Sequence, residues 1–220
     1  MSGAPAHHLP LTPHALFWDV DTQHDFVHAD GKLYVGDSEA IIPNLAALTA
    51  YAHGSGIRIV ASADDHEPGH RELSDSPDLR ESFPPHCMRG SAGQRKIAET
   101  ALRDPLVIEP DRPLPPGVRT HAGDFLLHKH WFDVFTNPNV LPLLGLLDPS
   151  DIVLYGVALD VCNRYAIEGL LRHRPGARIH LVTDATRAIH PENSAALLSD
   201  WERRSVELVA TKDVLSGQVV

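Results

Sequence analysis

The sequence is poor in cysteine and has no recognisable export signal. Only two of its 220 residues are cysteines, too few for the disulfide framework of a small secreted protein. No charged segment followed by an apolar one precedes Leu16, as a signal peptide would require. These absences predict a protein of the reducing cytoplasm.

Long apolar runs and an excess of positive charge are also missing. No run approaches the ~20 residues needed to cross a bilayer. The formal net charge is -10, and the 19 Lys and Arg residues are spread along the chain. Because nucleic acids and anionic membranes attract basic clusters, we expect neither as a partner. A small-molecule substrate is expected instead, and the sequence is compatible with a homo-oligomer without defining one.

The fold class follows from short apolar runs that alternate with helical patterns, which is typical of βαβ units. A hydrophobic content of 43% is sufficient for one buried core in a chain of this length. We therefore predict an α/β protein with a doubly wound, mainly parallel central sheet and helices on both faces. The expected strands are Ala15–Val20, Ile57–Ala61, Leu106–Ile108, Phe125–His128, Ile152–Val157, Arg178–Val182 and Val206–Val209.

Helices are expected between these strands. In the first, apolar residues recur at steps of four, three and four, which places them on one helical face: Ile41, Leu45, Leu48 and Ala52. Similar patterns predict helices over Pro138–Leu147, Asp160–His173 and Pro191–Arg204. We predict one domain over residues 15–213, a Pro-rich disordered tail over 1–14 that contains His7-His8, and a C-terminal tail over 214–220.

A long segment that begins at Asp64 and runs to Gly93 has neither helical nor strand periodicity. Loops beyond ~15 residues are usually functional or disordered, and this one is rich in potential ligands. Any one of its histidines alone would be a solvated loop residue. Together, one carboxylate and three imidazoles suit Zn, Fe(II) or Mn, so we predict one divalent metal ion, with zinc favoured, held by Asp64, His66, His70 and His86. The neighbouring Cys87 is interpreted as structural.

Reactive side chains follow other expected strands. Ligands bind at the carboxyl ends of the strands in open parallel sheets, and Asp21, Lys129 and Cys162 are expected there. Cys162 lies in the first turn of a helix, which predicts a thiol pKa below the ordinary ~8.5. Asp21 can carry the thiol proton to a leaving amine, while Lys129 balances the charge. Cys162 could instead be a small buried apolar residue. Asp21 and Lys129 could form a surface ion pair, but their positions at strand ends beside apolar runs make this alternative less attractive.

These residues resemble the nicotinamidases, a group within the isochorismatase-like cysteine hydrolases, from about Leu16 to Thr211. The segment from Asp21 to Phe26 is similar to the family motif D-x-Q-N-D-F, with His24 in place of Asn. Asp64-Asp65-His66 resembles D-x-H, and the segment from Phe83 to Cys87 resembles W-P-x-H-C, with Phe in place of Trp. His70 falls where a fourth, less regular ligand is found. Lys129 matches the family lysine, and the segment from Gly156 to Cys162 matches G-x-A-x-D-x-C.

The resemblance implies an isochorismatase-like fold and a hydrolase that converts nicotinamide to nicotinate and ammonia in NAD salvage. It implies that Asp21 and Lys129 assist attack by Cys162, which forms a thioester. A cis peptide bond before Ala158 would let the N–H groups of Ala158 and Cys162 form an oxyanion hole. The substrate ring would place its nitrogen on the metal and pack on Phe26 and Phe83.

The segment after Lys129 departs from the family pattern, because many nicotinamidases have small residues there. We assign Trp131 to the substrate pocket, with Phe132 and Phe135 as further candidates, although each is individually a common core residue. A related hydrolase that acts on another aromatic amide or an N-carbamoyl compound is the first alternative. A non-catalytic metal-binding module is the second, but it would leave no reason for the nucleophile, base and lysine to occur together.

Overall fold

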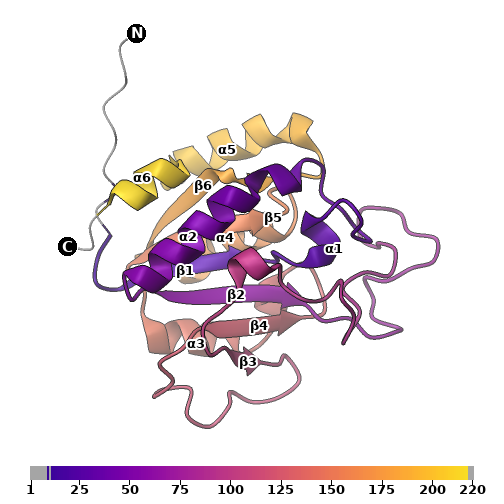
Figure 1. Cartoon of the computed structure of the whole chain (residues 1–220), viewed down its shortest axis with the longest axis horizontal. Helices are drawn as coiled ribbons and strands as arrows, with labels where there is room; N and C mark the ends of the chain where they lie inside the picture. Colours follow the sequence, from indigo (N-terminus) through magenta and orange to yellow (C-terminus); the bar gives the residue numbers. More distant parts are fainter. Residues whose placement is uncertain (1–8, 10, 218–220) are drawn as a thin grey trace.

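A computed structural model describes residues 9 and 11–217 and shows an all-parallel, seven-stranded sheet (Figure 1). The strand order is β3-β4-β2-β1-β5-β6-β7, so β1 to β4 form one half of the sheet, with β4 between β2 and the edge strand β3, and β5 to β7 extend the other half outward. The predicted parallel sheet is therefore confirmed. The strands are β1 Ala15–Val20, β2 Arg58–Asp64, β3 Leu106–Ile108, β4 Phe125–Lys129, β5 Asp151–Val157, β6 Arg178–Arg187 and β7 Val206–Val209.

Helices cover both faces of the sheet, because alternate strand residues point to opposite faces. Phe17 packs in one apolar core with Leu45 of α2, whereas its neighbour Trp18 packs in a second core with Leu170 of α4. Figure 1 shows α2 lying across one face of the sheet. The predicted layering is confirmed. The helices are α1 His24–Val27, α2 Ile42–Gly54, α3 Val140–Leu147, α4 Cys162–His173, α5 Ser194–Arg203 and α6 Thr211–Ser216, with 3-10 turns at Ser38–Ile41, Ala98–Thr100, Val134–Thr136 and Pro191–Asn193.

Packed structure extends beyond the predicted domain limits of 15 and 213. Leu9 and Leu11 are buried, and the backbone N–H of Thr12 donates to Asp151 at 3.2 Å. These two leucines cover core that the first strand alone would leave open, and α6 likewise continues to Ser216. The rest of the predicted tails, residues 1–8, 10 and 218–220, lies outside the described residues.

The long segment after β2 is ordered by hydrogen bonds to the start of the chain. The Gln23 side chain donates to the carbonyl groups of Asp64 (2.8 Å) and Gln94 (2.6 Å), which joins both ends of the segment. The Asp25 carboxylate accepts from the backbone N–H of Cys87 at 2.7 Å. A Cβ at Gly93 would lie 2.1 Å from that carboxylate, so only glycine fits. The segment is thereby held at the carboxyl ends of the strands.

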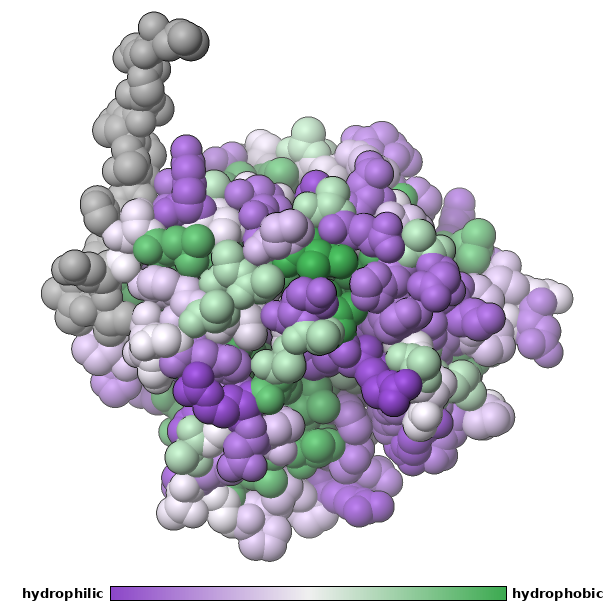
Figure 2. All heavy atoms as spheres, in the orientation of Figure 1, coloured by the Kyte–Doolittle hydropathy of each residue, from purple (hydrophilic) through white to green (hydrophobic). Residues whose placement is uncertain are grey.

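The molecular surface is mixed in polarity. Figure 2 shows hydrophilic residues over much of one face, with hydrophobic residues in smaller groups between them. Among the described residues, no helix combines the length and the apolar character that a membrane span requires.

Candidate active site

Asp21, Lys129 and Cys162 meet at the carboxyl end of the sheet. Asp21 directly follows β1, Lys129 ends β4, and Cys162 begins α4. The Lys129 Nζ atom lies 2.9 Å from Oδ2 of Asp21 and 3.7 Å from Sγ of Cys162. Asp21 also accepts a 2.6 Å hydrogen bond from Ser62. Asp21 and Lys129 are fully buried and Cys162 is 8% exposed, so their charges interact with little solvent screening.

Burial and the charges of neighbouring groups together set the protonation states of these three groups. Burial raises the pKa of Cys162 well above its usual value, and Lys129 only partly opposes this effect. The prediction of a lowered thiol pKa is therefore wrong, because desolvation outweighs the helix terminus. Burial also raises the pKa of Asp21, again against the charge of Lys129. Burial disfavours the charged form of Lys129, but Asp21 and Asp64 hold its pKa well above the usual value. The site thus contains a neutral thiol, an ammonium group and a carboxylate with raised proton affinity.

Gly156 and Asp160 of the motif G-x-A-x-D-x-C fix the backbone on either side of the turn that leads to Cys162. Gly156 has a φ of 114°, and a Cβ there would lie 2.0 Å from the carbonyl oxygen of Val20, so β5 can approach β1 only with glycine. The Asp160 carboxylate accepts from the N–H groups of Ile189 (2.9 Å) and His190 (2.7 Å). The peptide bond between Val157 and Ala158 is cis, as the resemblance implies.

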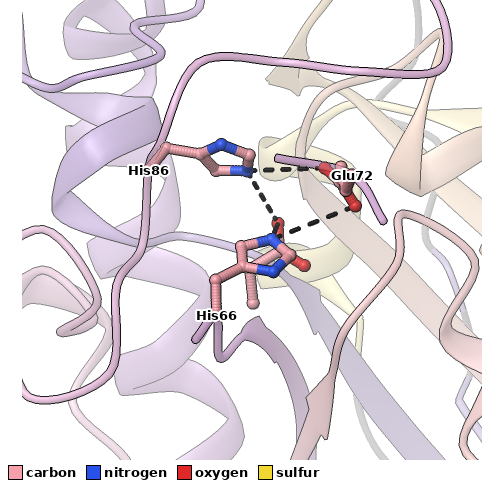
Figure 3. Close-up of side chains that lie close together, drawn as sticks. His66, Glu72 and His86 are labelled. Atoms are coloured by element: carbon pink, nitrogen blue, oxygen red, sulfur yellow. Dashed lines mark ion pairs between the residues drawn. The ribbon is translucent and has the colours of Figure 1, made fainter. Parts of the chain in front are cut away.

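A second cluster lies beside the first and consists of Asp64, His66, Glu72 and His86, whose ligand atoms all lie within 4.8 Å of one another. Figure 3 shows the two imidazoles and the Glu72 carboxylate converging. Nε2 of His86 lies 3.4 Å from Glu72 and 3.7 Å from Asp64, and Nε2 of His66 lies 3.9 Å from each carboxylate. All four residues are buried.

The chemistry of this cluster fits a divalent cation. Four of its buried atoms have no hydrogen-bond partner among the described residues, namely Asp64 Oδ2, His66 Nε2, Glu72 Oε2 and His86 Nε2. Such atoms are costly to bury unless something satisfies them. Nδ1 of His86 lies 2.8 Å from the carbonyl oxygen of Pro84, which can only accept, so Nδ1 carries a proton, and the neutral form of the ring has its lone pair on Nε2. Two imidazoles and two carboxylates form a donor set suited to zinc, iron or manganese.

This cluster differs from the predicted ligand set at one position. His70 lies outside it and faces Nδ1 of His66 at 3.4 Å, on the side away from the four unpaired atoms. Glu72 supplies the fourth potential ligand atom of the group in its place. Glu72 could not be identified from the sequence, because the segment has no periodicity and nothing in its spacing distinguishes this carboxylate from Glu67 or Glu81.

An apolar cavity separates the nucleophile from the four-residue cluster. Phe26 and Phe83 line it, as the sequence analysis places them, together with Ala158 and Cys162. Trp131 does not line the cavity. Its ring packs against Phe132 with centroids 4.0 Å apart and lies under the guanidinium of Arg71 at 4.4 Å. The assignment of Trp131 to the pocket is corrected, because Phe132 is the residue of that segment whose side chain reaches the cavity.

A third group, Asp65, Glu109 and His128, also brings potential ligand atoms together. The guanidinium of Arg89 already pairs with both oxygens of Asp65, with Nε at 2.9 Å from each. A divalent ion there would compete with the guanidinium for Asp65, so the group carries no metal assignment.

The fold and these two clusters are those of a hydrolase of the isochorismatase type. Residues 16–213 match the Isochorismatase domain, and the chain belongs to that family. The resemblance to nicotinamidases is confirmed by 28% identity over 207 residues to the nicotinamidase/pyrazinamidase of Mycobacterium tuberculosis, which covers 87% of this chain and 96% of that protein.

Two solved structures share the fold. A pyrazinamidase of Pyrococcus horikoshii in complex with zinc superimposes with a TM-score of 0.70 at 22% identity, and the match covers 90% of this chain and 99% of that one. A protein of L. infantum in complex with nicotinate gives 0.74 at 18% identity and covers 96% and 100% of the two chains.

Proposed function

We propose that this protein hydrolyses nicotinamide to nicotinate and ammonia in the cytoplasm, as a step of NAD salvage. One observation carries the proposal: the buried Cys162, which contacts the Lys129–Asp21 pair, shares a cavity lined by Phe26 and Phe83 with Asp64 and Glu72 of the four-residue cluster. The similarity to a nicotinamidase/pyrazinamidase supports this choice of substrate.

In the first half of the reaction, Asp21 takes the thiol proton as Sγ of Cys162 attacks the carboxamide carbon. The raised pKa of Asp21 suits this transfer, and the Lys129 ammonium offsets the negative charge that forms. The N–H groups of Ala158 and Cys162 would stabilise the tetrahedral oxyanion. Asp21 then returns the proton to the amide nitrogen, the C–N bond breaks, and ammonia leaves a thioester on Cys162.

In the second half, water attacks the thioester carbon and gives a proton to Asp21. The C–S bond breaks, the proton on Asp21 returns to the sulfur of Cys162, and the nicotinic acid formed passes its own proton to the released ammonia to leave nicotinate. Asp21 thus acts as base and acid in turn, and no proton is gained or lost over the cycle.

Asp64, His66, Glu72 and His86 would hold one divalent ion, with zinc favoured. When bound, the ion supplies a Lewis acid that can receive the ring nitrogen of the substrate and so orient the carboxamide. The zinc complex of the similar pyrazinamidase supports this assignment. The four unpaired buried atoms support it independently.

An ammonia-release assay tests the proposal. Purified enzyme should release ammonia from nicotinamide and pyrazinamide, but not from N-carbamoylglycine, and Cys162→Ala should abolish release. Cys87→Ala is the matched control, because Cys87 is fully buried outside the cavity and should leave turnover intact if the variant folds. Preference for the carbamoyl compound would favour the related hydrolase instead. Turnover by Cys162→Ala would remove Cys162 as nucleophile.

A further inference from the structure

We infer that His70 is a positioning residue that holds His66 in the one neutral tautomer able to present Nε2 to the metal cluster. The inference rests on the metal site of the proposed function and assigns His70 a role different from coordination.

Hydrogen bonds at one ring nitrogen and stacking on one ring face orient the side chain of His70. Its Nδ1 lies 3.4 Å from Nδ1 of His66 and 3.2 Å from the backbone nitrogen of Glu67. The ring also packs against that of His130, with centroids 4.2 Å apart and planes at 34°. These contacts hold Nδ1 of His70 toward His66.

The direction of each hydrogen bond follows from which groups can only donate. The backbone N–H of Glu67 is a donor, so Nδ1 of His70 must accept and cannot carry a proton. The hydrogen shared by the two Nδ1 atoms therefore belongs to His66. A neutral imidazole protonated at Nδ1 has its lone pair on Nε2, which is the atom that faces Asp64 and Glu72 at 3.9 Å.

The two cluster histidines differ in what fixes their tautomer. His86 uses the carbonyl oxygen of Pro84, which no side-chain substitution removes. His66 is fully buried, and among the described residues its Nδ1 has only the His70 nitrogen as an acceptor. Loss of that acceptor would leave a buried N–H unpaired or move the proton to Nε2. Metal binding should therefore depend on the side chain at position 70.

A matched pair of variants separates hydrogen bonding from packing. Asn and Leu have similar shapes, but only the Asn side chain offers an acceptor close to the place of Nδ1. The zinc dissociation constant is measured on demetallated protein, without substrate, by competition with a chromophoric chelator. This constant should rise about 10–100-fold in His70→Leu. His70→Asn should stay within a few-fold of wild type. His14→Leu, at an exposed histidine before β1, should leave the constant unchanged.

Cobalt spectra provide a readout that distinguishes positioning from coordination. The Co(II)-loaded wild type and His70→Asn should show the same ligand-field bands, since no ligand has been exchanged. His70 is only partly buried, so both variants should fold, as circular dichroism will verify. If the leucine variant fails to fold, His70→Ala provides the same loss of acceptor.

Three results would overturn the inference. Wild-type affinity in a folded His70→Leu or His70→Ala variant would show that the acceptor is unnecessary. If His70→Asn loses as much zinc affinity as His70→Leu and its cobalt bands change, His70 is a metal ligand. Absence of metal binding by the wild type would overturn the proposed metal site as well, which distinguishes that failure from the first two.

Discussion

Asp64 and Lys129 form an ion pair that joins the nucleophile to the metal cluster. Oδ1 of Asp64 pairs with the Lys129 ammonium, and Oδ2 faces Nε2 of His66 at 3.9 Å and of His86 at 3.7 Å. Burial raises the pKa of Asp64, but the charge of Lys129 together with His86 and His66 more than offsets this and leaves the pKa well below the usual value. One carboxylate therefore serves both halves of the site.

This shared carboxylate predicts a double defect in Asp64→Asn. The change removes a negative charge from both neighbours, so zinc affinity should fall by at least ~10-fold. The kcat for nicotinamide should also stay low at saturating zinc, because Lys129 has lost one of its two anionic partners. Glu67→Gln, at an exposed carboxylate of the same segment, should change neither quantity. Full kcat at saturating zinc would limit Asp64 to metal binding.

Asp21→Asn should lower kcat by about 10²–10⁴-fold, the usual contribution of general acid–base catalysis. The amide cannot take the thiol proton, and the raised pKa of the Cys162 thiol leaves little thiolate without a base. Zinc content should remain normal, since Asp21 lies outside the ligand cluster. Steady-state kinetics and metal analysis check both statements. Near-normal kcat would rule out Asp21 as the base.

Removal of the metal should stop nicotinamide turnover while leaving Cys162 open to alkylation. The ligand cluster lies across the cavity from Sγ, whereas Asp21 and Lys129 contact the sulfur from the strand ends. Iodoacetamide should label Cys162 in the chelated enzyme, with Cys87 unlabelled because it is fully buried. Peptide mass spectrometry identifies the labelled residue. Loss of labelling together with the metal would mean that the ion helps to form the thiolate.

A stability prediction concerns the opposite end of the sheet. Burial raises the pKa of Asp151, but hydrogen bonds from Thr12, His180 and Arg178 lower it more, so its folded-state value lies below the usual one. The carboxylate therefore stabilises the fold fully above the unfolded pKa of ~4, and this contribution is lost as the pH falls through the lower folded-state value. Asp151→Asn should cost about 1–3 kcal/mol at neutral pH.

Urea unfolding at neutral pH and below pH ~3 measures this difference. The difference in the free energy of unfolding between wild type and Asp151→Asn should become smaller at the lower pH, where the wild-type carboxylate is also protonated. Asp148→Asn, at an exposed ion pair, should have little effect at either pH. A gap that does not change with pH would contradict the assignment.

The sheet could be predicted from the sequence because its strands are buried on both faces and read as continuous apolar runs. β1, β3 and β7 have the predicted bounds. β6 runs five residues beyond the predicted end at Val182, to Arg187, through a polar stretch. Its pairing with β5 shifts register between Leu154 and Gly156, an irregularity that hydropathy alone does not reveal.

The side chains at strand ends were also accessible to prediction, since parallel strands bring their carboxyl ends to one edge. The conformation of the aperiodic segment that carries Glu72 could not be predicted, because it depends on hydrogen bonds to residues far away in the sequence, such as Gln23 and Asp25. For the same reason the sequence does not show that Phe132 rather than Trp131 lines the cavity, since both residues lie beyond the end of β4. The thiol pKa could not be predicted, because desolvation of Cys162 depends on the packing of all these elements.

The central claim is that Cys162 carries the acyl group during turnover, and rapid acid quench tests it most directly. Enzyme mixed with excess nicotinamide, quenched within one turnover and digested, should yield a Cys162 peptide with the mass of one added nicotinoyl group. The adduct should form and decay at rates consistent with kcat. Steady release of nicotinate with no adduct on Cys162 at any quench time, or with the adduct on Cys87, would contradict the account.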